Sequence, residues 1–157
     1  MKENYNYGVK ELNVEKSLIV ASNLLKRRME HQISEFSPND DQISASNAQI
    51  IGFLVANQAQ EIFQKTIEQA FSLRPSTVSA NLRLMETKGF IKREFSSLDA
   101  RKKKVIPTQK AIDFNDKLCK KGVEVEEEFK EIFSDYEYEK LKSLLLKLIV
   151  NMEQKEK

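Results

Sequence analysis

Cysteine and histidine are almost absent from this 157-residue sequence, which has one of each, Cys119 and His31. A disulfide framework within one chain is therefore excluded, and so is a structural zinc site, which takes four such ligands. A lone histidine and a lone cysteine, with no glycine-rich phosphate loop, also leave no visible catalytic set. We expect a protein that is not an enzyme and that carries no metal and no cofactor.

Glycine and proline are also scarce, with four and three residues, and this argues against a turn-rich all-β fold and favours long helices. The longest apolar run, Ile50 to Ala56, is far shorter than the roughly 20 residues that cross a bilayer. The first residues, Met1 to Asn4, are too polar for a signal peptide. We expect a cytoplasmic protein with no membrane contact, in keeping with the low cysteine content of proteins in a reducing compartment.

Positive charge is unevenly distributed, although the whole chain has a formal net charge of only +2. Residues 72–107 hold nine basic and three acidic side chains, a net charge of +6, and the rest of the chain is mildly acidic. A local basic block of this kind is typical of a nucleic-acid-binding surface. The alternative is a solvated helix face of no special function.

Apolar residues recur at helical spacing in most of the chain and predict six helices. The expected ranges are 14–36, 46–58, 64–71, 75–88, 108–132 and a last helix after a break at Ser134-Asp135. We expect buried side chains on the second and fourth of these helices, namely Ile50, Ile51, Phe53, Leu54, Val55, Val78, Leu82 and Met85.

A two-stranded hairpin is predicted where the helical period stops, with strands at 90–95 and 102–106 joined by a turn at 96–100. Gly89 suits the left-handed cap that ends the helix before the hairpin. Thr108 follows the hairpin and is a good N-cap for the next helix.

The third and fourth helices with the tight turn between them form a helix-turn-helix, and the hairpin adds a wing. The fold class is therefore mainly α with a small β-hairpin wing, flanked by N- and C-terminal dimerisation helices. We expect a loose N-terminus at 1–13, a dimerisation helix and turn at 14–42, a winged helix-turn-helix domain at 43–107, and C-terminal helices at 108–157 that complete the dimerisation region. The apolar stripes of the first and last helices would meet across a two-fold axis. We expect them to contribute Leu18, Leu25, Leu141, Leu145, Leu148 and Met152.

Several short motifs in residues 76–108 resemble the MarR family of bacterial transcriptional regulators. They are Ser76-Thr77-Val78-Ser79, Met85-Glu86, Lys88-Gly89-Phe90-Ile91, Arg93, Asp99-x-Arg101-x-Lys103-x-Val105 and Thr108. The resemblance implies a homodimer that binds a pseudo-palindromic operator and usually represses, under ligand or redox control. Four residues depart from the family pattern: Glu68 for a small Ala, Ala80 for a frequent Arg, Pro107 for Leu and Ala111 for Gly.

The predicted recognition helix has short polar side chains at its start, where such a helix enters the major groove. We expect DNA contacts from Arg74, Ser76, Thr77, Ser79, Asn81 and Arg83. Arg83 suits a bidentate pair with guanine, and the free N–H groups of the helix start suit a phosphate. In the alternative reading, Ser76 and Ser79 only cap and solvate the helix.

The predicted wing is strongly basic, and its expected DNA-binding residues are Lys92, Arg93, Asp99, Arg101, Lys102 and Lys103. In the family resembled, the Arg at position 101 enters the minor groove and the Asp at position 99 holds its guanidinium. A carboxylate on one side of a guanidinium does orient that rigid fork. Without DNA contact, the same two residues are a surface ion pair of little energetic value.

These features predict a sequence-specific regulator of double-stranded DNA that acts as a homodimer, most readily as a repressor modulated by a small effector of unknown identity. The alternative is a winged-helix module that docks a protein partner and binds DNA only non-specifically. Cys119 and His31 are weak candidates for redox sensing and for a ligand crevice, since single residues of this kind on a helix more often have no such role.

Overall fold

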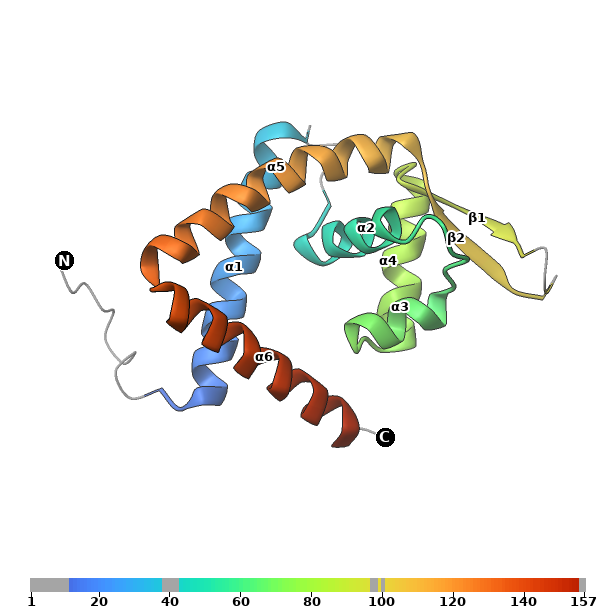
Figure 1. The fold of residues 1–157 in the computed structure, drawn as a ribbon. Helices are drawn as coiled ribbons and strands as arrows, with labels where there is room; N and C mark the ends of the chain where they lie inside the picture. The colour runs from blue at the N-terminus through green and yellow to red at the C-terminus, as the bar shows by residue number, and fades with distance from the viewer. Residues whose placement is uncertain (1–11, 38–42, 97–98, 100, 156–157) are drawn as a thin grey trace. The chain divides into compact units, whose positions relative to one another are not determined.

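The computed structural model describes residues 12–37, 43–96, 99 and 101–155. Its elements follow the order that the sequence predicts, with bounds that differ by one or two residues. They are α1 (Val14–Phe36), α2 (Ala45–Ala56), α3 (Gln64–Phe71), α4 (Pro75–Thr87), β1 (Ile91–Phe95), β2 (Lys103–Pro107), α5 (Gln109–Ile132) and α6 (Asp135–Lys155) (Figure 1). The expected loose N-terminus and the turn after α1 lie almost wholly outside the described residues.

The chain forms two compact units, residues 1–49 and residues 50–157. The first unit contains α1, whose start is capped by Asn13, since its Oδ1 accepts from the Lys16 amide at 2.9 Å. Ile33 is the one buried residue of α1, and several of its aliphatic side chains are exposed to solvent. The division into domains at 42 and 107 stays a prediction.

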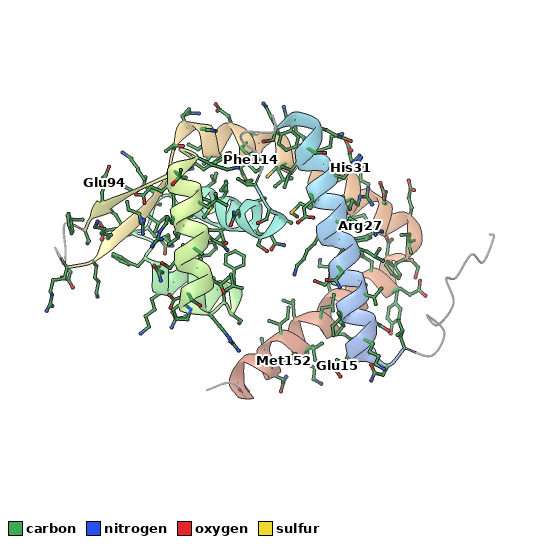
Figure 2. All side chains as sticks on the ribbon, turned by 180° about the vertical axis from the view of Figure 1, so that it is seen from behind. Glu15, Arg27, His31, Glu94, Phe114 and Met152 are labelled. Atoms are coloured by element: carbon green, nitrogen blue, oxygen red, sulfur yellow. The ribbon has the colours of Figure 1, made fainter. Side chains whose placement is uncertain are left out.

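The second unit has a core to which α2, α3, α4, the hairpin and the start of α5 all contribute. Phe90 and Phe114 meet edge to face, with ring centroids 5.4 Å apart, and join the start of the hairpin to α5 (Figure 2, which labels Phe114). The other large buried side chains of this unit are Ile50, Ile51, Leu54, Ile62, Ile67, Val78, Leu82, Met85, Ile91 and Val105. The expected burial of Phe53 and Val55 is wrong, because both are only half-buried: Phe53 instead packs edge-on against Phe71 at 5.6 Å.

The hairpin strands β1 and β2 pair antiparallel, in a register that places Ile91 opposite Pro107 and Phe95 opposite Lys103. One residue of the segment before α3 joins the sheet by an isolated bridge between Phe63 and Lys104. The Val105 amide also donates to the Ile62 carbonyl at 2.7 Å, which fastens the wing to the segment between α2 and α3.

The joint between α4 and the hairpin is a left-handed turn at Gly89, whose φ is +72°. The Phe90 amide donates to the Met85 carbonyl at 2.9 Å, and the Gly89 amide donates to the Glu86 carbonyl at 3.0 Å. This pattern is a Schellman motif, and the buried Phe90 and Met85 supply its usual apolar pair. The predicted glycine cap is confirmed.

Thr108 begins α5, as predicted, but its side chain makes no cap there. Its hydroxyl instead lies within hydrogen-bond distance of the carbonyl oxygens of Gly89 (2.7 Å) and Phe90 (3.0 Å). The Lys110 ammonium donates to the Lys88 carbonyl at 2.8 Å. Thr108 therefore occupies the N-cap position that the sequence predicts, but its hydroxyl is directed to the turn after α4 and makes no hydrogen bond to the amides of α5.

Replacing Gly89 by alanine should destabilise the protein by about 1–2 kcal/mol, because a Cβ at positive φ strains the backbone. No atom lies within 4 Å of such a Cβ, so the cost is conformational and not steric. Urea unfolding of Gly89→Ala and of the control Gly122→Ala measures this directly. Gly122 lies within α5, also with no atom near its Cβ, and alanine there should stabilise by about 0.5–1 kcal/mol. If alanine changed the free energy of unfolding in the same direction at both positions, the conformational strain expected at Gly89 would be contradicted.

Candidate nucleic-acid interface

Helix α4 begins without a side-chain cap, because its N-cap residue, Arg74, makes no cap hydrogen bond. Pro75 occupies the first turn, where its missing N–H costs nothing. The turn before it contains Ser72 in the left-handed conformation, with φ of 48°. The uncapped amides at the start of α4 are therefore suited to an anion such as a DNA phosphate.

The outward face of α4 holds most of the recognition-helix residues that the sequence predicts. Val78, Leu82 and Met85 are buried as expected, and they mark the inner face. Of the six predicted contact residues, the four that are exposed are Arg74, Ser76, Thr77 and Arg83. Ser79 and Asn81 are half-buried on the flanks of the helix. The exposed polar side chains are thus concentrated at the start of α4, and Arg83 is exposed two turns further along the helix.

Arg93 of β1 is held by Glu86 near the end of α4. The Arg93 Nε donates to Glu86 Oε2 at 2.9 Å, and Nη2 donates to the same oxygen. The hydrogen bond from Arg93 holds the pKa of Glu86 below its ordinary value, and the nearby charge of Lys103 adds to this. The structure therefore places Arg93, a predicted DNA contact, in a brace between the recognition helix and the wing.

The tip of the wing holds Asp99 and Arg101 in the arrangement that the sequence predicts. Asp99 Oδ1 accepts from the Arg101 amide at 3.0 Å and from the Arg101 Nε at 3.3 Å. The hydrogen bond from the Arg101 amide is the main cause that lowers the pKa of Asp99. The Arg101 guanidinium and Lys102 lower it further, and the Lys102 ammonium lies 3.7 Å from Asp99 Oδ2. The Arg101 side chain is 92% exposed. Asp99 thus orients the Arg101 guanidinium through Nε, and the rest of the guanidinium is accessible to a ligand.

The lysines of the wing differ in their surroundings. Lys92 pairs with Glu94 on the same strand at 2.8 Å (Figure 2 labels Glu94). Lys104 pairs with Glu61 at 3.3 Å, and the Ser96 hydroxyl donates to the other oxygen of that carboxylate at 2.7 Å. Lys102 and Lys103 are exposed, and the Lys103 ammonium lies 5.1 Å from the ring centre of the exposed Phe95. The outward-directed cations therefore gather towards the tip.

Sequence reasoning missed the two carboxylates that hold the wing, Glu61 and Glu86, and the exposed aromatic ring of Phe95. Glu61 lies 43 positions before Lys104, and no local pattern links them. Glu86 and Arg93 lie seven residues apart on two different elements, so neither the helical nor the strand period connects them.

The two weak candidates are both at the surface and belong to no cluster. Cys119 is exposed on α5, and His31 of α1 is 78% exposed with Nδ1 3.5 Å from Glu35 Oε1. Within the described residues, no three His, Cys, Asp or Glu side chains are grouped as metal ligands would be. No helix in that part of the chain has the length and apolarity to cross a bilayer.

Residues 41–102 match the sequence model of the MarR family. The fold is similar to that of MepR of Staphylococcus aureus in complex with DNA, with a TM-score of 0.81 and 24% identity over 90% of this chain and 99% of that chain. The chain therefore has the winged-helix fold, and its segment from α2 to β1 resembles the MarR family. Its fold is also similar to that of the transcription regulator MarR from Oenococcus oeni, with a TM-score of 0.71 and 23% identity over 87% of this chain and 98% of that chain. No curated protein matches the sequence.

The departures from the MarR-family pattern fit the fold without disturbing it. Glu68 accepts from the Gln64 amide group at 2.9 Å, one turn earlier on α3. Pro107 ends β2, where its missing N–H costs no ladder bond, and Ala111 is fully buried in α5. Ala80 is exposed on the outward face of α4.

Loss of the Glu86–Arg93 brace should lower stability in a pH-dependent way. The pKa of Glu86 is lowered in the folded protein, so the charged carboxylate stabilises the fold above about pH 4.5, and this contribution is lost as the pH falls through the lowered value. Glu86→Gln should unfold at lower urea concentration than the wild type near neutral pH, and the difference should shrink in acid. Glu127→Gln, on the exposed surface of α5, is the control. If the difference in urea midpoint between Glu86→Gln and the wild type were the same at neutral and acid pH, the stabilising role of the Glu86–Arg93 pair would be contradicted.

Proposed function

We propose that this protein is a sequence-specific transcription regulator that binds double-stranded DNA as a homodimer and represses by occupying its operator. The observation that carries the proposal is the Arg101 side chain, which is almost fully exposed at the wing tip and oriented by Asp99. An outward guanidinium that is oriented by a carboxylate suits a narrow A·T-rich minor groove, whose negative potential attracts arginine. The exposed polar side chains at the start of α4 suit the adjacent major groove.

The alternative, a module that docks a protein partner, is less consistent with the surface charge. Lys102, Lys103 and Arg101 follow one another at the wing tip and are all exposed, whereas acidic side chains of the hairpin are occupied by lysine and arginine partners. Phosphates attract such a cluster strongly, and the attraction weakens with salt.

The homodimer accounts for aliphatic side chains that one chain leaves in water. Leu25 is 44% exposed on α1, and Leu141 and Met152 of α6 are 38% and 59% exposed. The other residues predicted at the dimer interface, Leu18, Leu145 and Leu148, are half-buried in the single chain. Burial of both stripes against a second copy would remove this surface from water and place two recognition helices about one DNA turn apart, ~34–36 Å.

A small effector would act by changing the spacing of the two recognition helices. A ligand that prefers a spacing unlike that of the operator must weaken DNA binding, by thermodynamic linkage. The pocket at the end of α2 and beside β2, about 110 Å³ in volume, is smaller than the roughly 300 Å³ of a typical ligand site. This pocket is therefore too small to hold the proposed effector.

Replacing Arg101 by alanine should weaken operator binding at least tenfold, because it removes the minor-groove cation from each half of the dimer. Fluorescence anisotropy with a labelled operator, over a range of salt concentrations, measures the effect. The salt dependence should also become shallower, by about one released counterion for each arginine lost.

The matched control is Lys117→Ala, which removes an exposed cation from α5 outside the wing. Thermal melting of both variants establishes that they fold. Wild-type affinity in folded Arg101→Ala would exclude the assigned role of the wing.

A further inference from the structure

The outward face of α4 is short of groups that read base edges by hydrogen bonds. Few side chains between Arg74 and Thr87 are both long enough to reach deep into a groove and polar enough to form hydrogen bonds there. Arg83 is exposed, whereas Asn81 is half-buried on the flank and Glu86 is bound to Arg93. The helix therefore has one arginine for direct polar readout beyond its first turn.

Three exposed residues form an apolar stripe on this outward face: Thr77, Ala80 and Leu84. Their spacing of three and four residues places them one above another on successive turns. Val78 and Leu82 define the inner face, and Ala80 lies about 200° around the helix from Val78, so it faces away from the core. Leu84 is 42% exposed, although it lies next to a core where leucine is readily buried.

The surroundings of the stripe favour DNA as its occupant. Arg74 lies before the stripe and Arg83 beside it, and both are exposed. The single acidic residue of 74–87, Glu86, has its charge taken up by Arg93. An apolar stripe within a positively charged surface is complementary to a negatively charged ligand that displays apolar groups between its phosphates.

The major groove of B-DNA displays one apolar group, the C5 methyl of thymine, and small aliphatic side chains are its usual contacts. We infer that Thr77, Ala80 and Leu84 read thymine methyl groups in each half-site. This inference rests on the proposed function. Specificity then comes from thymines that contact the stripe and from a guanine that pairs with Arg83.

The test uses an operator obtained by selection with the full-length wild-type protein. Each thymine of a half-site is replaced by deoxyuridine, which removes the methyl and leaves the base pair intact. At one or two positions per half-site the affinity should fall about fourfold, the effect of one buried methyl, and about fifteenfold when both half-sites are changed. Deoxyuridine at thymines outside the half-sites should leave the affinity unchanged.

A variant then identifies the protein side of the contact. Leu84→Ala keeps a strong helix former at that position, so α4 should stay folded, and thermal melting checks this. The variant should lose the discrimination between thymine and deoxyuridine at one position per half-site. Val123→Ala, which trims an exposed aliphatic side chain on α5, should keep that discrimination.

The outcomes separate this inference from the proposed function. An operator whose affinity is unchanged by deoxyuridine at every position would overturn the methyl readout and leave the regulator intact. Equal discrimination by folded Leu84→Ala at every thymine would exclude Leu84 from it. A wild-type protein that selects no sequence would overturn both proposals.

Discussion

One left-handed turn of backbone at Gly89 sets the angle between the recognition helix and the wing. The turn reverses the chain directly from α4 into β1, with Lys88 and Phe90 on either side. A DNA-binding surface made of two elements works only if both reach their grooves at once, so this joint has to be rigid. Three further contacts hold it: the Glu86–Arg93 pair, the Thr108 hydroxyl at the carbonyls of Gly89 and Phe90, and the Lys110 ammonium at the Lys88 carbonyl. In Figure 1 the hairpin extends beyond the helices of its unit, as a wing must if it is to reach a second groove.

The same contacts change how the charge of residues 72–107 should be understood. Part of the net charge of +6 is positioned to hold the fold, because Lys92, Arg93 and Lys104 each pair with a carboxylate. The pairing concentrates the outward cations at the wing tip, at Arg101 to Lys103. In the proposed function, a wing built in this way would make a few well-placed contacts with DNA, whereas a broad basic surface would bind any duplex equally.

Local patterns in the sequence predicted much of this architecture. The helices follow from apolar residues at a spacing of three and four, and the Gly89 cap follows from a property of one residue type. The Asp99–Arg101 pair was predicted from the resemblance to the MarR family, and the structure contains it. Pairings between distant segments were not predictable, because Glu61 contacts Lys104 only after the chain has folded. Thr108 illustrates the same limit: its N-cap position was predictable, but the contact of its hydroxyl with the carbonyls of Gly89 and Phe90, 19 and 18 residues earlier, was not. The packing of Phe53 against Phe71, which leaves Phe53 half-buried, depends on the turn between two helices.

In the proposed function, α4 and the wing of each protomer bind one duplex together, so that the duplex is contacted twice. Selection of bound duplexes from a random DNA pool at two salt concentrations tests it most directly. A palindrome whose half-sites lie ~10 bp apart should be enriched, with A·T-rich flanks where Arg101 enters the minor groove. Enrichment of no sequence, with binding that is lost steeply as salt rises, would mean contact with phosphates alone and would exclude sequence-specific binding by the dimer.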